Sequence, residues 1–237
     1  SLMFAMTEMA LRRAQGMSFD TPLDLLDRLL PEVHEYGKAI SRKPDLRLTF
    51  ALNALVGVDA AAWLLYAREH GLTAFDDIIP ARFRAALQHR HDRVACIPLL
   101  AYAIPMNEIV QHVDEGYFFF KIKIGSDPDR DGDREKMLQW DMARVSAIHE
   151  AIGRRETPYT RNGRLPYYFD ANGRYDSKDR LQRFLDHCRK IGAFDQIALI
   201  EEPFPESYKV PVGDLGVRLA ADESAHCDHD VEERIAL

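Results

Sequence analysis

Short apolar runs that alternate with amphipathic stretches of helical length dominate the chain from about residue 93 onward. Such runs, bounded by turn residues, are typical of buried strands. Five runs fit this description: RVACIPLLAY, YFFFKIKIG, LPYYFDANG, QIALIEEPF and VRLAADES. Helical patterns lie between most of them, for example DREKMLQWDMARVSAIHEAIG and SKDRLQRFLDHCRKIG. Because strands joined through helices run parallel, the sequence predicts an α/β fold with a parallel sheet.

The preceding residues, 1–92, have a helical period instead. The stretch SFDTPLDLLDRLLPEVHEYG places leucines at helical spacing after Ser, Asp and Thr residues that favour a helix N-terminus. A second stretch, LTFALNALVGVDAAAWLLYAREHG, has Ala51, Leu55 and Val58 on one stripe, and we expect a heavily buried helix that ends at Gly71. The sequence therefore predicts a helical region over residues 1–92 and an α/β region over residues 93–237.

Charge and cysteine usage limit the kinds of partner that the protein can have. The net charge of -7 and the absence of a long basic run argue against a nucleic-acid partner. Cys96, Cys188 and Cys227 are widely spaced and form no CxxC pattern, so neither a disulfide framework nor a zinc site is indicated. We also expect no apolar stretch long enough to span a membrane. A cytoplasmic globular protein with neither nucleic acid nor a membrane as partner is therefore predicted.

Charged residues follow the apolar part of four successive strand candidates. KIK precedes GSDPD, YYFD precedes ANG, LIEE precedes PFPE, and LAAD precedes ES. In a parallel (β/α) barrel the carboxyl ends of the strands form the active-site face. A doubly wound sheet also collects ligand groups at strand carboxyl ends, but at one switch point between neighbouring strands. Repetition on successive strands favours the barrel.

Three of these residues are carboxylates that such a barrel would bring together, namely Asp170, Glu201 and Asp222. Converging carboxylates repel one another, and their pKa values rise unless a cation is present. Oxygen ligands suit a hard divalent cation such as Mg²⁺, which also keeps positions for water or substrate. Any one of these acids alone is better explained as a solvated loop residue. The set of three predicts a Mg²⁺ site.

Lys121 and Lys123 lie two residues apart within one strand candidate, so their side chains point to the same face. A lysine beside another ammonium group and partly removed from water loses its proton more easily. Lys123 could then act as a base near neutral pH, with Lys121 as the neighbour that lowers its pKa. The alternative is an edge strand whose two lysines face solvent and discourage aggregation.

The motifs FKIKIG, FDANGRY, IEEPF and ADES, in this order, resemble the enolase superfamily, in particular its muconate lactonizing enzyme and mandelate racemase-like members. The resemblance implies a modified (β/α)8 TIM-type barrel preceded by an α+β capping domain, of which residues 1–92 would be the helical part. Eight strands close such a barrel, whereas residues 93–237 contain about five strand candidates. We therefore expect a partial barrel, with the first five or so strands present and the C-terminal part missing.

The resemblance also implies a role for each residue that matches a family motif. Lys123 matches the base that removes the proton alpha to a carboxylate, and Lys121 matches its partner on the same strand. The residues that match the three metal ligands are Asp170, Glu201 and Asp222. Asn172 and Glu223 match positions that lie behind the metal ligands or face the substrate. Glu202 is given no role.

The family uses a Lys or His base with Mg²⁺ ions at an enediolate. The resemblance therefore implies a Mg²⁺-dependent isomerase or lyase that acts on a small carboxylate, with a racemase, epimerase or cycloisomerase outcome favoured. A sugar-acid dehydratase of the same superfamily is one alternative, and a catalytically silent relative is another. The outcome depends on a second catalytic group on the opposite face of the substrate, which the family carries in the missing strands. A homo-oligomer is also implied.

Overall fold

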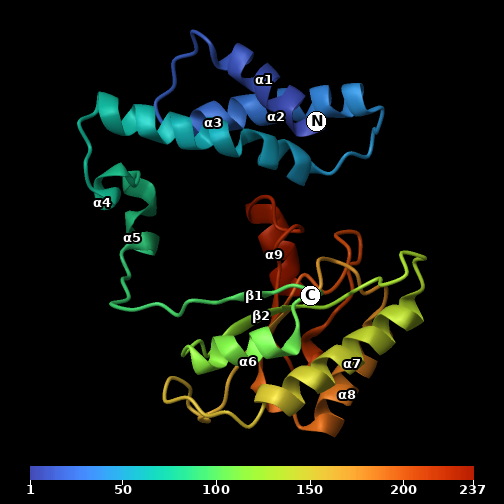
Figure 1. The fold of residues 1–237 in the computed structure, drawn as a ribbon. Helices are drawn as coiled ribbons and strands as arrows, with labels where there is room; N and C mark the ends of the chain where they lie inside the picture. The colour runs from blue at the N-terminus through green and yellow to red at the C-terminus, as the bar shows by residue number, and fades with distance from the viewer. The chain divides into compact units, whose positions relative to one another are not determined.

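The computed structural model describes all residues, 1–237, and divides into two compact units, Ser1–Asp92 and Arg93–Leu237. The chain path of each unit can be followed in Figure 1, where colour runs from blue at the N-terminus to red at the C-terminus.

The first unit is built from helices. Three of them, α1, α2 and α3, pack against one another, and their shared core includes Met6, Leu29 and Leu55. Helix α2 begins where the sequence predicts a helix start, since Pro22 is its first residue and Thr21 forms a capping box with Asp24. The helices are α1 (Leu2–Ala14), α2 (Pro22–Ser41), α3 (Leu48–Glu69), α4 (Phe75–Ile78), η1 (Ala81–Phe83) and α5 (Arg84–Leu87).

Helix α3 differs from expectation in two respects. It is not heavily buried, because only one face packs on α1 and α2, while Val56 and Leu64 on other faces are exposed within the unit. The expectation that no stretch is long and apolar enough to span a membrane is also wrong, since an 18-residue stretch of the 22-residue helix α3 has a mean hydropathy of 1.7. Core helices of soluble proteins also reach this length and hydropathy.

The second unit contains one five-stranded sheet in which each strand pairs in parallel with its neighbour in the chain, in the order β1-β2-β3-β4-β5. Every strand lies inside one of the five predicted runs, and the predicted α/β fold class is confirmed. The strands are β1 (Leu99–Leu100), β2 (Phe120–Lys123), β3 (Tyr167–Asp170), β4 (Ile197–Glu201) and β5 (Leu219–Ala220). The helices are α6 (Met106–Asp114), α7 (Arg134–Ile152), α8 (Lys178–Ile191), η2 (Phe194–Gln196), η3 (Gly213–Leu215) and α9 (Asp228–Ala236).

Helices α6, α7 and α8 lie side by side against one face of this sheet (Figure 1). Phe120, Ile122 and Phe169 point toward these helices and are at most 1% exposed. Alternate residues of a strand point to opposite faces, so Lys121 and Lys123 lie on the face away from the helices. The sequential strand order has no switch point, which agrees with part of a (β/α) barrel rather than with a doubly wound sheet.

Candidate active site

The register of the sheet places three predicted site residues in one row across adjacent strands. Lys123 pairs with Asp170, and Asp170 pairs with Glu201, so their positions lie side by side on β2, β3 and β4. Glu201 pairs in turn with Ala220 of β5, and Asp222 follows two residues later. All of these positions are at the carboxyl ends of their strands. The parallel register is therefore the reason why residues far apart in the sequence meet at one edge.

Asp170 is the central carboxylate of this edge. Its side chain is 1% exposed, and its Oδ2 atom accepts hydrogen bonds from Lys123 Nζ at 2.5 Å and from Lys121 Nζ at 2.9 Å. Its Oδ1 atom accepts the backbone N–H of Asn172 at 3.0 Å. Burial alone would raise the pKa of Asp170, but the hydrogen bonds from both lysines hold it below its usual value. Asp170 is therefore an ionised group that brings the two ammonium groups together.

Lys121 bridges two of the predicted metal ligands. Its Nζ atom lies 2.9 Å from Asp170 Oδ2 and 2.6 Å from Glu201 Oε2, and it lies 5.0 Å from the centre of the Tyr168 ring. Burial lowers the pKa of Lys121, but the hydrogen bonds to Glu201 and Asp170 outweigh it and raise the pKa above its usual value. Lys121 is thus a protonated group that neutralises two carboxylates.

Asp222 completes the acidic cluster. Its carboxyl group is hydrogen-bonded to Glu201, and burial, this hydrogen bond and the charge of Glu223 raise the pKa of Asp222 to about 6. The Tyr168 hydroxyl donates a hydrogen bond to Glu201 Oε2. Lys121 therefore links Asp170 to Glu201, and the hydrogen bond between Glu201 and Asp222 links the third predicted metal ligand to them. One ammonium group compensates only part of the negative charge of these three carboxylates.

No group of three or more His, Cys, Asp or Glu side chains in the structure has the arrangement of a metal site. The ammonium group of Lys121 lies between Asp170 and Glu201 and supplies positive charge there. The donor set nevertheless fits Mg²⁺, because it consists of carboxylate oxygens and already surrounds a cationic group. Burial is the largest cause of the raised pKa of Asp222, and the neighbouring carboxylates Glu201 and Glu223 add to it.

Asn172 lies beside Lys123, and Glu223 contacts Asn172. The Lys123 Nζ atom donates to Asn172 Oδ1 at 2.6 Å, and Asn172 Nδ2 donates to Glu223 Oε1 at 3.0 Å. The other carboxylate oxygen of Glu223, Oε2, is buried and has no hydrogen-bond partner. Asn172 has a left-handed backbone with φ of 45°, which Asn adopts more readily than most residues. All seven predicted site residues are thus brought into one connected cluster.

Two residues of this cluster were missed by the sequence analysis. Glu202 is 4% exposed, and its Oε2 atom accepts the backbone N–H of Asp222 at 2.7 Å and the hydroxyl of Ser224 at 3.0 Å. It therefore fixes the turn that carries Asp222. Tyr168, which contacts Glu201, lies two residues before Asp170 on the same face of β3, and strand alternation was the signal that could have found it.

A third missed residue, Asp141 of α7, anchors the backbone that follows Lys123. This carboxylate is completely buried and accepts the N–H groups of Gly125 at 2.7 Å and Ser126 at 3.3 Å, and the hydroxyl of Tyr175 at 2.9 Å. Burial raises the pKa of Asp141 to about 6 in spite of these donors. Its only signal in the sequence is an acidic residue among the apolar residues of a helix.

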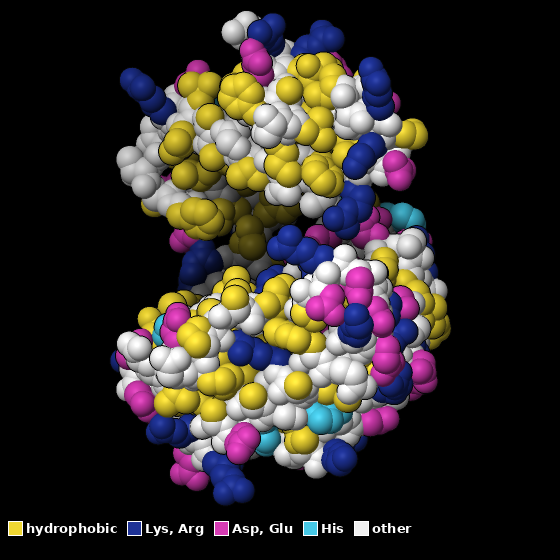
Figure 2. All heavy atoms as spheres, turned by 45° about the vertical axis from the view of Figure 1, so that its right-hand side comes forward, with side chains coloured by type: hydrophobic (Ala, Val, Ile, Leu, Met, Phe, Trp, Pro, Cys, Tyr) yellow, Lys and Arg dark blue, Asp and Glu magenta, His cyan; other side chains and the backbone are white.

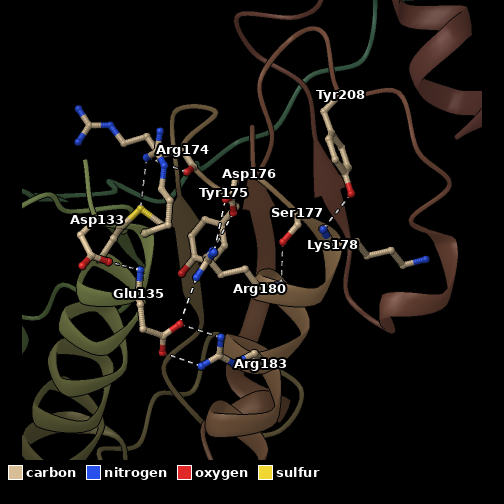
Figure 3. Close-up of polar contacts among 12 residues, drawn as sticks. Asp133, Glu135, Arg174, Tyr175, Asp176, Ser177, Lys178, Arg180, Arg183 and Tyr208 are labelled. Atoms are coloured by element: carbon tan, nitrogen blue, oxygen red, sulfur yellow. Dashed lines mark hydrogen bonds and ion pairs between the residues drawn. The ribbon is translucent and has the colours of Figure 1, made fainter. Parts of the chain in front are cut away.

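The loop between β3 and α8 is held by polar contacts on both sides (Figure 3). At the start of α8, Ser177 Oγ accepts the N–H of Arg180, and the Tyr208 hydroxyl accepts the N–H of Lys178. Glu135 of α7 receives hydrogen bonds from Arg180 and Arg183 of α8. These contacts join α7 to α8 and fix the segment that follows Asn172.

A parallel sheet with acidic residues and lysines at its carboxyl edge is the arrangement of a (β/α)-barrel enzyme. A family model described as Enolase C-terminal domain-like matches residues 106–237, which is more than half of the chain. The chain belongs to this family, within the enolase superfamily, and the predicted resemblance is confirmed. Comparison with curated protein sequences gives no match.

Solved structures with the same fold include members of several enzyme classes. A racemase from Streptomyces coelicolor A3(2) with bound magnesium has 19% identity and a TM-score of 0.57, over 98% of this chain and 61% of that one. A dipeptide epimerase from Enterococcus faecalis V583 has 20% identity and a TM-score of 0.58, over 99% and 56%. A mutant L-talarate/galactarate dehydratase liganded with Mg and L-glucarate has 18% identity and a TM-score of 0.58, over 99% and 52%.

At these identities the similarity establishes the fold, and the chain spans less than two thirds of each of these proteins. Partial coverage agrees with the predicted partial barrel. Members of the enolase superfamily are Mg²⁺-dependent, and the racemase structure contains the metal, so Mg²⁺ is confirmed as the cofactor of the family.

Proposed function

We propose that this chain carries the metal and base part of an enzyme that removes the proton alpha to a carboxylate of a small substrate. The single observation that supports this most strongly is the position of Lys123. Its Nζ atom lies within hydrogen-bond distance of Asp170 and Asn172, at the edge where Glu201 and Asp222 also lie. A base within hydrogen-bond reach of bound substrate is the first requirement for proton abstraction.

Asp170, Glu201 and Asp222 would hold Mg²⁺ through their carboxylate oxygens. When bound, the metal would stabilise the negative charge that develops on the substrate carboxylate as the proton leaves. In the structure the ammonium group of Lys121 compensates part of the charge of Asp170 and Glu201. Glu202 would keep Asp222 in position through the hydrogen bond to its backbone N–H.

Lys123 would act as the base in its neutral form and accept the alpha proton on Nζ. The ammonium group of Lys121 contacts the same oxygen of Asp170 and is the cationic neighbour of Lys123. Asn172 Oδ1 accepts a hydrogen bond from Nζ and would hold it in a defined direction. The side chains of the chain thus supply a base, its orientation and a cationic neighbour.

The favoured outcomes are racemisation, epimerisation and cycloisomerisation, because the paired lysines and the ADES motif that carries Asp222 resemble the members that catalyse them. A sugar-acid dehydratase is the alternative. The similarity in fold to the L-talarate/galactarate dehydratase supports this alternative. All of these reactions begin with the removal of an alpha proton.

We further propose that the whole protein is a homo-oligomer. Light scattering on the purified protein tests this proposal.

Exchange of alpha protons in D₂O tests the proposed function. With Mg²⁺ present, the full chain is expected to exchange the alpha proton of at least one carboxylate in a panel of amino-acid derivatives and sugar acids, as followed by proton NMR. Lys123→Met should abolish the exchange, because no other base is placed at this position. The matched control is Lys190→Met, since Lys190 is an exposed lysine on α8 whose side chain makes no hydrogen bond or ion pair. Exchange that survives in Lys123→Met would contradict the assignment of Lys123 as the base. If the parent chain exchanges no compound of the panel, the result would favour a catalytically silent relative.

A further inference from the structure

Asp141 is a buried carboxylate to which the proposed function gives no role. Charged side chains are spread over the surface of the protein, as Figure 2 shows for one face. Four carboxylates are buried instead, namely Asp141, Asp170, Glu201 and Glu202. The other three belong to the acidic edge of the sheet or support it, whereas Asp141 lies on α7 and is 0% exposed. A buried charge is costly unless hydrogen-bond donors bind it, so the partners of Asp141 indicate its role.

The turn that carries Asn172 packs directly against the backbone that follows Lys123. The Arg174 N–H donates to the carbonyl oxygen of Ala171 at 3.1 Å and closes a turn with Asn172 inside it. Gly125 lies so close to this turn that a Cβ atom on it would be 2.8 Å from Arg174 Cβ and 3.1 Å from the Ala171 carbonyl oxygen. The two segments are therefore in contact beyond the ends of β2 and β3.

Hydrogen bonds hold these two segments together from both sides of Gly125. The Gly125 N–H donates to Asp141 Oδ2 at 2.7 Å, and its carbonyl oxygen accepts a hydrogen bond from Arg174 Nη1 at 3.0 Å. Asp141 Oδ2 also accepts the hydroxyl of Tyr175, the residue directly after the turn, at 2.9 Å. One carboxylate of α7 therefore binds both segments. We call Gly125, Asp141, Arg174 and Tyr175 the loop clamp.

The loop clamp lies in the interior, where a lost hydrogen bond is costly. Asp141 and Tyr175 are completely buried. The Tyr175 ring packs edge-on against Phe184 of α8, with ring centres 6.1 Å apart. Because a buried polar group without a partner costs free energy, Asp141 holds each of its donors in place.

The contact between Lys123 and Asn172 depends on the position of this turn. The sheet fixes Lys123 and Asp170 through their register, but Asn172 lies beyond the end of β3. Asn172 Oδ1 nevertheless accepts a hydrogen bond from Lys123 Nζ at 2.6 Å. A displaced turn would therefore change this contact while Asp170 and Glu201 keep their register on the strands.

We propose that Asp141 is a positioning residue which, through the loop clamp, keeps Asn172 in contact with Lys123. Asp141 makes no hydrogen bond to either residue and acts on them through Gly125 and Tyr175. The proposal rests on the proposed function for the role of Lys123 as the base. The position of Asn172 is a property of the protein without substrate, so the two proposals can fail separately.

The side-chain amide of Asn172 reports on this position in the full chain. The chain has four asparagines, so NMR of protein labelled with ¹⁵N-asparagine gives few side-chain amide signals, and Asn172→Ala identifies the signal of Asn172. Tyr175→Phe removes one hydrogen bond of the loop clamp and keeps the buried ring. It should shift the Asn172 signal and leave the other three in place. These belong to Asn53, Asn107 and Asn162.

Tyr167→Phe is the matched control for this measurement. Tyr167 is also completely buried, but its hydroxyl contacts His149 at 3.1 Å, outside the loop clamp. Both changes remove one buried hydroxyl group, so an effect of lost stability alone would be the same in both variants. An Asn172 signal that stays in place in Tyr175→Phe, or that shifts equally in both variants, overturns the proposal.

Exchange of alpha protons measures the consequence for the base. With the compound that the parent chain exchanges fastest, Asp141→Asn should lower the maximal rate about tenfold or more, because small displacements of reacting groups have large effects on rate. The substrate concentration at half-maximal rate and the Mg²⁺ affinity should change less than about twofold, since the strands keep their register. Glu150→Gln, at an exposed residue of α7, should behave like the parent.

Two results of the exchange measurement count against Asp141 as a positioning residue. An unchanged maximal rate in Asp141→Asn would show that the base does not depend on the loop clamp. A loss of Mg²⁺ affinity equal to the loss of rate would show that Asp141 supports the whole edge of the sheet instead. If the parent chain exchanges no compound, the proposed function fails, and the NMR comparison still decides whether the loop clamp positions Asn172.

Discussion

At the scale of single residues, two lysines compensate part of the negative charge of the site. Lys121 and Lys123 share one oxygen of Asp170, and Lys121 also contacts Glu201. The sequence predicted that both lysines lie on one face, because strand alternation fixes side-chain direction. Strand alternation could have placed Tyr168 on the same face as Asp170, but it could not predict the contact between Tyr168 and Glu201, because that contact depends on the register between β3 and β4.

Glu202 offers a prediction at this scale. Glu202→Gln should weaken Mg²⁺ binding about tenfold, because groups that hold a metal ligand in place typically contribute this much. The substitution removes the charge that accepts three hydrogen bonds from Asp222 and Ser224, while it keeps the size of the side chain. Calorimetric titration with MgCl₂ measures the effect. Glu232→Gln is the control, since Glu232 is exposed on α9, and an equal effect of both changes would contradict the role of Glu202.

Asp141 makes stability depend on pH. Its pKa is raised to about 6 by burial, so the native state binds this proton more tightly than the unfolded state does. The contribution of Asp141 to the free energy of unfolding therefore falls as pH rises from about 4 to about 6, by roughly 3 kcal/mol.

Urea unfolding of Trp63→Phe at several pH values, followed by the fluorescence of Trp140, measures this slope. The background substitution leaves Trp140, the neighbour of Asp141 in α7, as the single reporter. Asp141→Asn should remove this part of the pH dependence. The same slope in both proteins would show that Asp141 does not carry it.

At the scale of secondary-structure elements, the sheet was largely predictable and the exposure of helices was not. All five strands lie inside the predicted runs, because short apolar runs between helical patterns identify buried strands. They are shorter than those runs, and β1 and β5 contain two residues each. The outward face of α3 could not be predicted, because apolar periodicity does not reveal which faces find a partner.

The packing of the sheet on its helices gives a prediction for β3. Phe169 is completely buried and makes an edge contact with Phe184 of α8, with ring centres 5.3 Å apart. Phe169→Ala should lower the free energy of unfolding by about 3–5 kcal/mol, because the cavity left behind cannot be refilled. Urea unfolding followed by Trp140 fluorescence measures the loss. Ile235→Ala, at a residue that is 81% exposed, should change stability little, and a similar loss in both variants would contradict the packing.

At the scale of the whole molecule, the acidic cluster, Lys121 and Lys123 all belong to the unit Arg93–Leu237. The motifs FKIKIG, FDANGRY, IEEPF and ADES predicted the family, which the match over residues 106–237 confirms. The role of each site residue stays a prediction. The arrangement of Lys121 between Asp170 and Glu201 was not predictable, since it depends on how side chains balance charge after folding.

The central claim is that Asp170, Glu201 and Asp222 form a Mg²⁺ site at the carboxyl edge of the sheet. Calorimetric titration of the full chain with MgCl₂ tests it most directly. We expect one Mg²⁺ per chain, with binding lost in Asp170→Asn and in Glu201→Gln and unchanged in Glu232→Gln. Absence of Mg²⁺ binding, or equal binding in all three variants and the parent chain, would contradict the claim.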